Sequence, residues 1–412
     1  MTLDLNFVRS QYPVFQNPDT AQWAFFENAG GSYVPGQVIE RLNHFFKFTK
    51  VQPYGIFAAS AAAGEAMEAA YRCMAELLNT DPDQLTLGPS TTLNFYVLAQ
   101  AIRHDLKAGD EIIVTNQDHE ANIGCWRRLS EFGIIIREWQ IDPQTGELNI
   151  EDLKKLVSSR TRLVCFTLCS NIVGTMNDVK AINEIVHDAG AVAVADGVSF
   201  APHCLADIHE LGVDLFLFST YKTFGTHIGV MWGRREILAK LESQGHYFNS
   251  EKPRYRLNPA GPLHAEIAAL AGIGEYYDAL YEKHFTDLNL SRHERGVKLF
   301  ELFAEHESRL ANQLLDTLQE LRGVRIIGQA HAAAGRRAAT IAFIPADKKP
   351  SDIVNRLAEK FIAVRNGHFY ARRCVEALGL GDPEEGIIRI SLVHYNTKEE
   401  VNRLIDGLRS LL

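Results

Sequence analysis

Short apolar runs alternate with amphipathic, helix-length segments through the middle of the chain. Most of the runs are continuously apolar, as expected for strands that are covered on both faces, and the segments between them repeat apolar residues at helical spacing. This order is typical of an α/β domain with a mainly parallel sheet. The predicted strands are residues 111–115, 134–139, 162–168, 191–195, 215–219 and 229–232.

Several of the predicted helices carry clear start signals. Asn149 and Asp178 precede two of them in the α/β region, and Thr397 with Glu400 forms a capping box ahead of the last one. The predicted helices are residues 64–78, 150–157, 179–189, 265–281, 287–321 and 350–360, with two further strands at 338–344 and 387–393.

Chain length and the order of elements predict two domains. With 412 residues, of which 46% are hydrophobic, the chain has enough apolar material for more than one core. A long helix followed by a strand, a helix and a strand is typical of a smaller α+β unit. We therefore predict a large domain over residues 21–284 and a small domain formed by residues 1–20 with 285–412.

The charge balance and the N-terminal residues argue against several function classes. The chain has 42 Lys plus Arg against 51 Asp plus Glu, so nothing favours binding to nucleic acid or to an anionic membrane surface. Its first residues lack the basic start and apolar run of an export signal, and no apolar stretch is long enough to span a bilayer. We expect a cytoplasmic globular protein.

Six cysteines are scattered along the chain without a pairing or metal-binding pattern. There is no CxxC pair and no histidine spacing that would bind zinc, so we predict no metal site. Free, buried thiols in a reducing compartment are the simplest interpretation. The cysteines are Cys73, Cys125, Cys165, Cys169, Cys204 and Cys374.

A lysine and an aspartate at two predicted strand ends are the strongest candidates for chemistry. Lys222 follows the strand 215–219, where α/β sheets place ligands, and its neutral amine could form a Schiff base with an aldehyde cofactor. Asp196 ends the strand 191–195 and could pair with the ring nitrogen of pyridoxal phosphate. The alternatives are a surface cation and a helix cap. Their spacing of 26 residues is about one βαβ step, which would place them on adjacent strands.

Three further segments contribute candidates near predicted strand ends. Ser90, Thr91 and Thr92 precede a helix whose amino end could hold a phosphate, although an ordinary helix cap would also explain them. His119 follows a strand and could stack on an aromatic ring, and Asn171 follows another and could bind a ring hydroxyl. No single segment is decisive, but their order along one sheet favours a common pocket.

These motifs make the chain resemble the class V aminotransferase fold, and within it the group II cysteine desulfurases and selenocysteine lyases. The resemblance covers nearly the whole chain. It implies a pyridoxal phosphate enzyme of fold type I, with a seven-stranded, mainly parallel sheet, a smaller α+β domain and an amino-acid substrate. It also implies a homodimer with active sites near the interface. The matching segments are FFENAGGSYVP, STTLNF, DHEAN, SNIVGT, ADGVS, FSTYKTFG and GIIRISLVHYNTKEEVNRL.

The resemblance implies roles for the residues at matching positions. Lys222 would be the Schiff-base lysine, Asp196 the partner of the ring nitrogen, and His119 the stacking residue. Asn171 would contact the ring hydroxyl or the substrate, and Arg389 would bind the substrate α-carboxylate, with a structural ion pair as the alternative for Arg389. The remaining implied roles are phosphate binding by Thr91, Thr92, Ser219 and Tyr221, a cofactor contact by Ser199, and substrate binding by Asn28 and Arg365.

The chain departs from the desulfurase pattern at the catalytic loop. In the segment AVRNGHFYARR, Tyr370 stands where a desulfurase has its nucleophilic Cys, so the resemblance predicts that this thiol is missing. Cys374 lies four residues beyond and could replace it only if the loop were rearranged; a packing role is the alternative. Gly261 stands where a threonine reaches across the dimer to the partner's phosphate, and Tyr221 and Ser199 stand where His and Gln are usual.

Without that thiol, the resemblance favours a carbon–sulfur lyase that acts on cysteine, cystine or a related β-substituted amino acid. Lys222 would remove the α-proton, a β-leaving group would depart, and pyruvate and ammonia would form. Tyr370 could protonate the leaving group or shape the pocket. The alternatives are a desulfurase that uses Cys374, an epimerase or aminotransferase, and a cofactor-binding protein with a regulatory or scaffold role.

Overall fold

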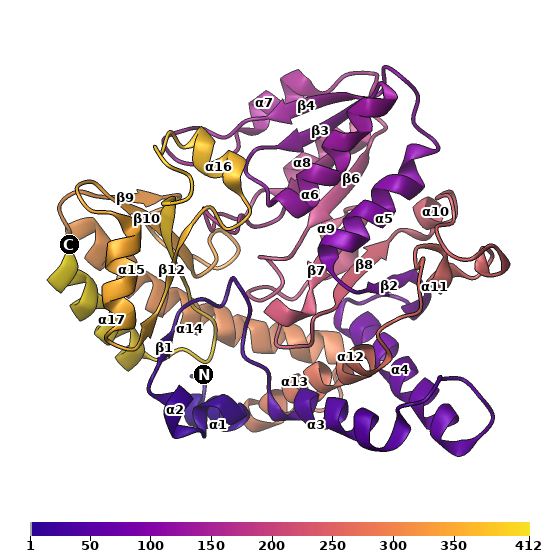
Figure 1. Cartoon of the computed structure of the whole chain (residues 1–412), viewed down its shortest axis with the longest axis horizontal. Helices are drawn as coiled ribbons and strands as arrows, with labels where there is room; N and C mark the ends of the chain where they lie inside the picture. The colour runs from indigo at the N-terminus through magenta and orange to yellow at the C-terminus, as the bar shows by residue number, and fades with distance from the viewer. Residues whose placement is uncertain (1) are drawn as a thin grey trace.

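Seven strands form a large sheet in the computed structural model, which describes residues 2–412 (Figure 1). In order across the sheet they are β2 (Leu85–Gly88), β8 (Gly229–Gly233), β7 (Leu215–Ser219), β6 (Val192–Asp196), β5 (Thr161–Thr167), β3 (Glu111–Thr115) and β4 (Ile135–Trp139). Strand β8 runs antiparallel to both neighbours, and the pairs from β7 to β4 are parallel. The predicted seven-stranded, mainly parallel sheet is confirmed.

Helices cover both faces of this sheet. On one face lie α5 (Thr91–Arg103) and α6 (Glu120–Arg127), and on the other α4 (Ala58–Leu77), α7 (Ile150–Leu156), α8 (Val179–Asp188), α12 (His264–Ala269) and α13 (Ala271–His284). Ile112 and Val114 of β3 pack in the core of the first layer, whereas Ile113 between them packs in the core of the second. This double burial explains why the strands are continuously apolar in sequence.

A second, four-stranded antiparallel sheet lies beside the large one, at the left of Figure 1. Its strands are β12 (Arg365–Gly367), β13 (Ile387–Ser391), β10 (Thr340–Pro345) and β9 (Val324–Ile327), and the helices of this part are α14 (Arg292–Glu320), α15 (Pro350–Ala358), α16 (Arg372–Ala377) and α17 (Lys398–Leu411). An N-terminal strand, β1 (Ala24–Phe25), pairs in parallel with β11 (Ile362–Ala363). Two residues further on, the backbone of Glu27 forms an isolated parallel β-bridge with that of Ser391. The N-terminal segment thereby lies next to β13.

Element boundaries differ from the predictions where local interactions decide them. The predicted helix 287–321 begins at Arg292, because Ser291 and Glu294 form a capping box. The predicted helix 265–281 is two helices that meet at Leu270. Strands β1, β2, β9, β11 and β12 escaped prediction because they are two to four residues long, too short for a readable hydrophobic pattern.

Short helices and turns complete the described chain. They are α1 (Leu5–Ser10), α2 (Pro18–Ala21), α3 (Gly36–His44), α9 (Ile208–Leu211), α10 (Arg235–Leu238) and α11 (Pro253–Arg256), a π-helical turn at Phe45–Thr49, and 3-10 turns at Pro13–Phe15, Pro82–Gln84, Arg128–Phe132, Thr220–Lys222 and Tyr247–Asn249. Within residues 2–412, none of the helices combines the length and the apolar character needed to cross a bilayer.

Candidate active site

The carboxyl ends of β6 and β7 form the base of a pocket. The two strands are adjacent and parallel, with Asp196 opposite Leu217, and both Asp196 and Lys222 line the pocket. A neighbouring hollow extends it toward the small sheet, where Arg365, Tyr370 and Arg389 lie. The other sequence-predicted residues that line the pocket are Ser90, Thr91, Thr92, His119, Asn171, Ser199, Ser219 and Tyr221.

Lys222 lies on a tight turn directly after β7. The hydroxyl of Thr220 braces the turn, because it lies 2.6 Å from the carbonyl oxygen of Thr226 and 3.0 Å from that of Ile228. Burial is the main cause that lowers the pKa of Lys222 to about 8, and the positive charge of Arg389 adds to the effect. A large share of this amine is therefore neutral near pH 8, and the neutral form is the nucleophile.

Asp196 presents a buried carboxylate to the pocket. Its side chain is 2% exposed and accepts a hydrogen bond from the N–H of Val198 (2.8 Å). Burial raises the pKa of Asp196 to about 6, although Val198 and the charge of Lys222 oppose the shift. A carboxylate in this setting is stabilised by a cationic partner within the pocket.

Asp118 is a second buried carboxylate that the sequence analysis missed. Burial, and after it the negative charge of Asp196, raises the pKa of Asp118 to about 7. The Thr115 hydroxyl and the Asn122 amide (2.7 Å) donate hydrogen bonds to it. The sequence feature that could have identified Asp118 is its position directly before His119 in the DHEAN segment, where we considered only the histidine.

His119 faces the pocket as a neutral ring. It is the N-cap of α6, and its Nδ1 accepts a hydrogen bond from the N–H of Ala121 (3.1 Å), so the proton of the neutral ring is on Nε2. Burial, followed by the charges of Lys222 and Arg389, lowers the pKa of His119 to about 3. A neutral imidazole is suited to stacking on another aromatic ring.

The amino end of α5 opens onto the same pocket. Ser90 caps the helix by accepting a hydrogen bond from the N–H of Leu93 (3.1 Å), and the hydroxyl of Thr91 lies 2.7 Å from that of Ser219. Thr92 is exposed on the first turn. Gly229 of β8 permits this close approach, since a Cβ there would lie 2.4 Å from the Thr91 nitrogen. The result is a helix amino end with adjacent hydroxyls, an arrangement that is suited to an anion.

Tyr221 stacks face to face on His227, with ring centroids 4.6 Å apart and an interplanar angle of 2°. Burial raises the pKa of Tyr221, which keeps its hydroxyl protonated. His227 also lines the pocket and was missed by the sequence analysis, although it follows Lys222 by five residues in the same glycine-containing loop. The pair adds an aromatic wall on the side of the α5 amino end.

Arg389 reaches the pocket from the small sheet and is 2% exposed. Its Nη2 donates to Oε1 of Glu27 (2.9 Å), its Nη1 donates to the carbonyl oxygen of Asn171 (3.3 Å), and its guanidinium lies 3.7 Å from the ring centre of Phe369. Arg365, whose side chain is 68% exposed, lies 3.7 Å from the same Glu27 oxygen. The ion pair considered as the alternative for Arg389 is therefore present, and it faces the pocket. Sequence reasoning missed Glu27, although it lies in the FFENAGG segment.

Tyr370 lies on an unusual loop at the mouth of the pocket. Phe369 and Tyr370 have φ angles of +47° and +58°, a region that aromatic residues rarely adopt. The loop is held by the Asn171 amide, which donates to the Phe369 carbonyl (3.0 Å), and by the Glu120 N–H, which donates to the Tyr370 carbonyl (2.8 Å). The Tyr370 ring is 70% exposed and lies 5.5 Å from the ring of His119.

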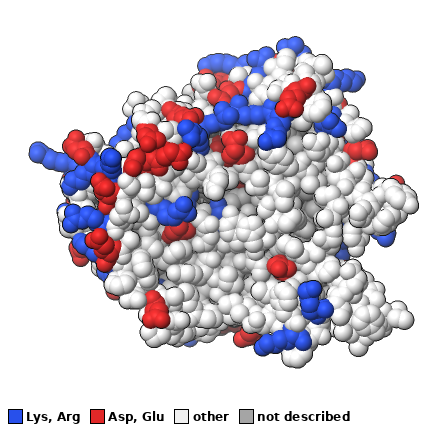
Figure 2. All heavy atoms as spheres, in the orientation of Figure 1, with Lys and Arg blue, Asp and Glu red and all other residues white. Residues whose placement is uncertain are grey.

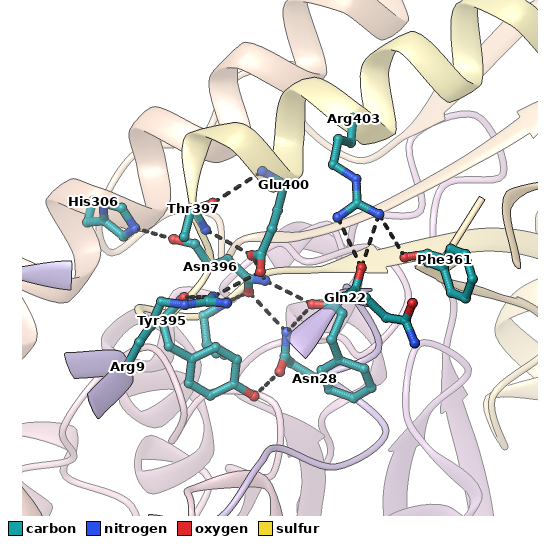
Figure 3. Close-up of polar contacts among 12 residues, drawn as sticks. Arg9, Gln22, Asn28, His306, Phe361, Tyr395, Asn396, Thr397, Glu400 and Arg403 are labelled. Atoms are coloured by element: carbon teal, nitrogen blue, oxygen red, sulfur yellow. Dashed lines mark hydrogen bonds and ion pairs between the residues drawn. The ribbon is translucent and has the colours of Figure 1, made fainter. Parts of the chain in front are cut away.

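The structure places the side chain of Asn28, predicted from sequence to bind substrate, in a buried hydrogen-bond network beside the pocket. Asn28 is 2% exposed, and its amide donates to the carbonyl oxygen of Ser391 (2.8 Å). The same amide donates to Oδ1 of Asn396 (3.2 Å), and the Asn28 oxygen accepts from the Tyr395 hydroxyl (Figure 3). These bonds join the N-terminal segment to the turn that precedes α17. The side chain of Asn28 thus joins two parts of the fold, and its neighbour Glu27 faces the pocket.

The thiols are poor nucleophiles in this fold. Cys374 lies in α16 and packs in an apolar cluster with Ala371, Val375 and Leu378; burial raises its pKa to about 12. Cys169 lines the pocket but is 1% exposed, and burial raises its pKa as well. Both thiols are therefore protonated at neutral pH, and the reactive form of cysteine is the thiolate.

Comparisons with known proteins match the chain over nearly its full length. The family described as "Aminotransferase class-V" matches residues 24–295 and 297–404. The chain is 34% identical to the aminotransferase-like protein FGM3 of Gibberella zeae, covering 98% of each protein. It is 30% identical to a probable cysteine desulfurase of Halalkalibacterium halodurans, covering 97% of this chain and 96% of the relative. The crystal structure of the cysteine desulfurase CsdA from Escherichia coli matches with a TM-score of 0.83 at 25% identity, over 100% of this chain and 98% of the other.

Proposed function

Because the chain belongs to the aminotransferase class-V family, whose enzymes use pyridoxal phosphate, we propose that it is a carbon–sulfur lyase that acts on cysteine, cystine or a related β-substituted amino acid. It is an enzyme related to the cysteine desulfurases. One observation carries the proposal: Lys222 lines both the pocket that holds Asp196 and the adjoining hollow that holds Arg389. The thiol that lines the pocket within the described chain, Cys169, is buried.

The pocket residues fit pyridoxal phosphate by their chemistry. Asp196 offers a buried carboxylate for a protonated ring nitrogen, and Lys222 offers an amine with a pKa of about 8 for an aldehyde. The neutral ring of His119 can stack on the pyridine ring. The amino end of α5 offers N–H groups for the phosphate, with the hydroxyls of Thr91 and Ser219 close by.

In the proposed reaction, residues of the small sheet bind the substrate carboxylate and residues of the large sheet carry out the proton transfer. When bound, the cofactor supplies an electron sink for negative charge at the substrate α-carbon. Arg389 on the small sheet would hold the α-carboxylate and orient the α-proton, and Lys222 on the large sheet would take that proton as a general base. Tyr370 and His119 would border the substrate side chain at the pocket mouth.

The state of the thiols favours elimination over desulfuration. A desulfurase needs a thiolate that attacks the substrate sulfur, but Cys374 is buried with a pKa of about 12. Tyr370 carries a hydroxyl that cannot form a persulfide. Because burial keeps Cys374 and Cys169 protonated at neutral pH, we propose that the substrate sulfur leaves the β-carbon with its electron pair.

Incubation of the purified holoenzyme with cysteine is expected to yield pyruvate, ammonia and sulfide in equal amounts, because β-elimination is followed by hydrolysis. Pyruvate can be followed with a coupled lactate dehydrogenase assay, and sulfide and amino acids by chromatography. Formation of alanine would contradict the proposal and favour desulfuration. A keto acid that forms only with an amino acceptor would favour an aminotransferase, the function suggested by the name of the Gibberella zeae relative.

Cys374→Ala is the matched control for this assay. The variant is expected to form pyruvate at the rate of the unmodified enzyme, because the buried thiol takes no part in elimination. Loss of activity in a variant that still folds and binds cofactor would support the desulfurase alternative. The temperature of thermal unfolding distinguishes this outcome from a packing defect. Some loss of stability is expected, because Cys374→Ala removes a buried sulfur atom from the apolar cluster.

We further propose that the enzyme is a homodimer. An exposed apolar segment between α3 and α4, residues 46–57, projects at the lower right of Figure 1, where Figure 2 shows few charged atoms. Phe48 is 67% exposed, Ile56 is fully exposed and Phe57 is 58% exposed. Lys47 and Lys50 are also exposed in this segment, between the apolar side chains. Large apolar side chains exposed this close together are typical of a surface that is covered by another protein. A Cβ added at Gly261 would meet no atom within 4 Å, so the space beside this residue is open.

Glutamate at Phe48 and Ile56 together is expected to convert the dimer into monomers, since burying two carboxylates in an apolar interface without partners is unfavourable. Size-exclusion chromatography with light scattering measures the mass directly. Phe132→Glu is the matched control, because Phe132 is 49% exposed and lies on a turn outside the segment. An unchanged dimer in the double variant would rule out this surface as the interface.

A further inference from the structure

We propose that Glu27 is a built-in competitor of the substrate α-carboxylate: it pairs with Arg389 in the free enzyme and shifts to Arg365 when the substrate binds. This inference rests on the proposed function, since it takes Arg389 as the group that binds the α-carboxylate. Glu27 would be a positioning residue that sets the affinity for carboxylates and takes no part in the chemical step.

The guanidinium of Arg389 has one edge that both carboxylates need. A bidentate carboxylate contact uses two neighbouring N–H groups on one edge of the fork. The Nη1 side faces the carbonyl oxygen of Asn171, so the edge formed by Nε and Nη2 is left for a carboxylate. Glu27 holds Nη2, and Nε is buried without a hydrogen-bond partner within residues 2–412. The ring of Phe369 covers one face of the guanidinium, which directs an incoming carboxylate to this edge.

The Glu27 contact is incomplete and can be displaced. Oε1 accepts from Arg389, but Oε2 is buried without a hydrogen-bond partner in the described part of the chain. A buried, unpaired carboxylate oxygen is costly, and a single hydrogen bond is weaker than a bidentate pair. Gly30 permits this position, since a Cβ there would lie 2.4 Å from Oε1 of Glu27. A substrate that satisfies both Nε and Nη2 would therefore form the stronger contact.

Arg365 provides a second place for the Glu27 carboxylate. Arg365 and Arg389 are directly opposite on β12 and β13, an arrangement in which like charges repel. Oε1 of Glu27 lies between them, 2.9 Å from Arg389 and 3.7 Å from Arg365. Arg365 is 68% exposed and has room to adjust. Once the substrate neutralises Arg389, Glu27 can neutralise Arg365 with a small movement of its side chain.

The exchange predicts a tighter carboxylate site when Glu27 loses its charge. An internal competitor raises the apparent Kd by the inverse of the fraction of time that it leaves the site free. Glu27→Gln should lower the Kd for a simple carboxylate by about 3–10-fold, because the amide no longer forms an ion pair with Arg389. The KM for cysteine should fall in parallel, with kcat unchanged. If Glu27 only held Arg389 in place, Glu27→Gln would instead raise both the Kd for the carboxylate and the KM for cysteine.

Calorimetric titration of the holoenzyme with propionate tests this directly, and propionamide is the uncharged probe of the same shape. The expected result is tighter binding of propionate to Glu27→Gln, with the affinity for propionamide unchanged. Glu384→Gln is the matched control, since this exposed carboxylate pairs with Arg372; it should leave the propionate Kd unchanged. An unchanged or weaker propionate Kd in Glu27→Gln would overturn the proposal.

A double-mutant cycle tests the destination of the carboxylate. In the unmodified enzyme, Arg365→Gln should weaken propionate binding, because the displaced Glu27 carboxylate then lacks its second arginine. In the Glu27→Gln background the same substitution should have no effect on propionate binding, because residue 27 carries no charge there. An equal loss in both backgrounds would mean that Arg365 binds the ligand directly, and would overturn the exchange. Glu27→Asp keeps the negative charge but is too short to reach Arg389, so it should also tighten propionate binding. This second variant keeps the test valid if Glu27→Gln does not fold.

The calorimetric readout is independent of the reaction catalysed. If alanine or a transamination product replaces pyruvate while propionate still binds more tightly to Glu27→Gln, the lyase proposal fails and the exchange stands. If pyruvate forms as expected but the propionate Kd does not respond to Glu27→Gln, the exchange fails and the lyase proposal stands.

Discussion

Replacing Lys222 by alanine is expected to abolish the yellow absorbance of the purified protein and to lower the rate of product formation by about 10²–10⁴-fold. Its amine would hold the cofactor aldehyde and also take the substrate α-proton. Among the described residues that line the pocket and the adjoining hollow, it is the only lysine. Absorbance spectra of the purified variant and steady-state assays at saturating cysteine measure the two effects.

Lys222→Arg separates the charge of this side chain from its chemistry. Arginine keeps a positive charge beside Asp196, but its guanidinium stays protonated and is not a nucleophile. The arginine variant should therefore lose absorbance and activity as completely as the alanine variant. Persistent yellow colour in either protein would mean that a different group holds the cofactor.

The lowered pKa of Lys222 adds a pH signature to the same prediction. Only the neutral amine attacks the aldehyde, so the cofactor-free enzyme should take up pyridoxal phosphate faster as the pH rises through about 8. Stopped-flow absorbance between pH 6.5 and pH 9.5 measures this rate. A midpoint near the ordinary lysine value of 10.5 would contradict the effect of burial.

The sequence was sufficient to locate the pocket because its central residues follow strand ends. Asp196 is the last residue of β6, and Asn171 and Lys222 follow β5 and β7, the two neighbours of β6 in the sheet. Parallel strands place their carboxyl ends along one edge. Hydrophobic runs therefore predicted which polar side chains would meet, even though the exact boundaries of the strands differed by a residue or two.

The contacts between the two sheets could not be predicted in the same way. Glu27 and Arg389 are 362 positions apart, and no local pattern specifies their pairing. The FFENAGG segment indicated that this region matters, but successive residues of an extended segment point to opposite sides. The sequence does not show that the side chain of Asn28 points into the network of Figure 3, while that of Glu27 points into the pocket.

The strained backbone conformation at the pocket mouth could not be predicted from sequence patterns either. Phe369 and Tyr370 both adopt positive φ, which their residue types disfavour. Hydrogen bonds from Asn171 and Glu120, both on the large-sheet side of the chain, hold their carbonyl groups. The conformation of the loop therefore depends on how the two sheets pack, and the sequence near Tyr370 reveals only which side chains are present.

Asp196→Asn is expected to have opposite effects on the cofactor-free protein and on the holoenzyme. Burial raises the pKa of Asp196 to about 6 from an ordinary value of 3.8, so the fold favours the protonated carboxyl group. This contribution to stability is complete below about pH 4 and is lost as the pH rises through about 6. The asparagine variant, which never ionises, should be more stable than the unmodified cofactor-free protein at pH 8 by on the order of 2–3 kcal/mol.

Urea unfolding of the cofactor-free proteins at pH 4.5 and pH 8 measures that difference, which should shrink at the lower pH. Cofactor binding should reverse the order at pH 8, because only the carboxylate can form an ion pair with a protonated ring nitrogen. The holoenzyme variant should lose about 10²–10³-fold in kcat, the usual loss for one missing electrostatic partner. An asparagine variant that is less stable without cofactor at pH 8, or fully active with it, would show that Asp196 serves the fold rather than the cofactor. The predicted reversal follows from one physical cause, since the burial that makes the carboxylate costly in the empty pocket also strengthens its attraction to a cationic ring.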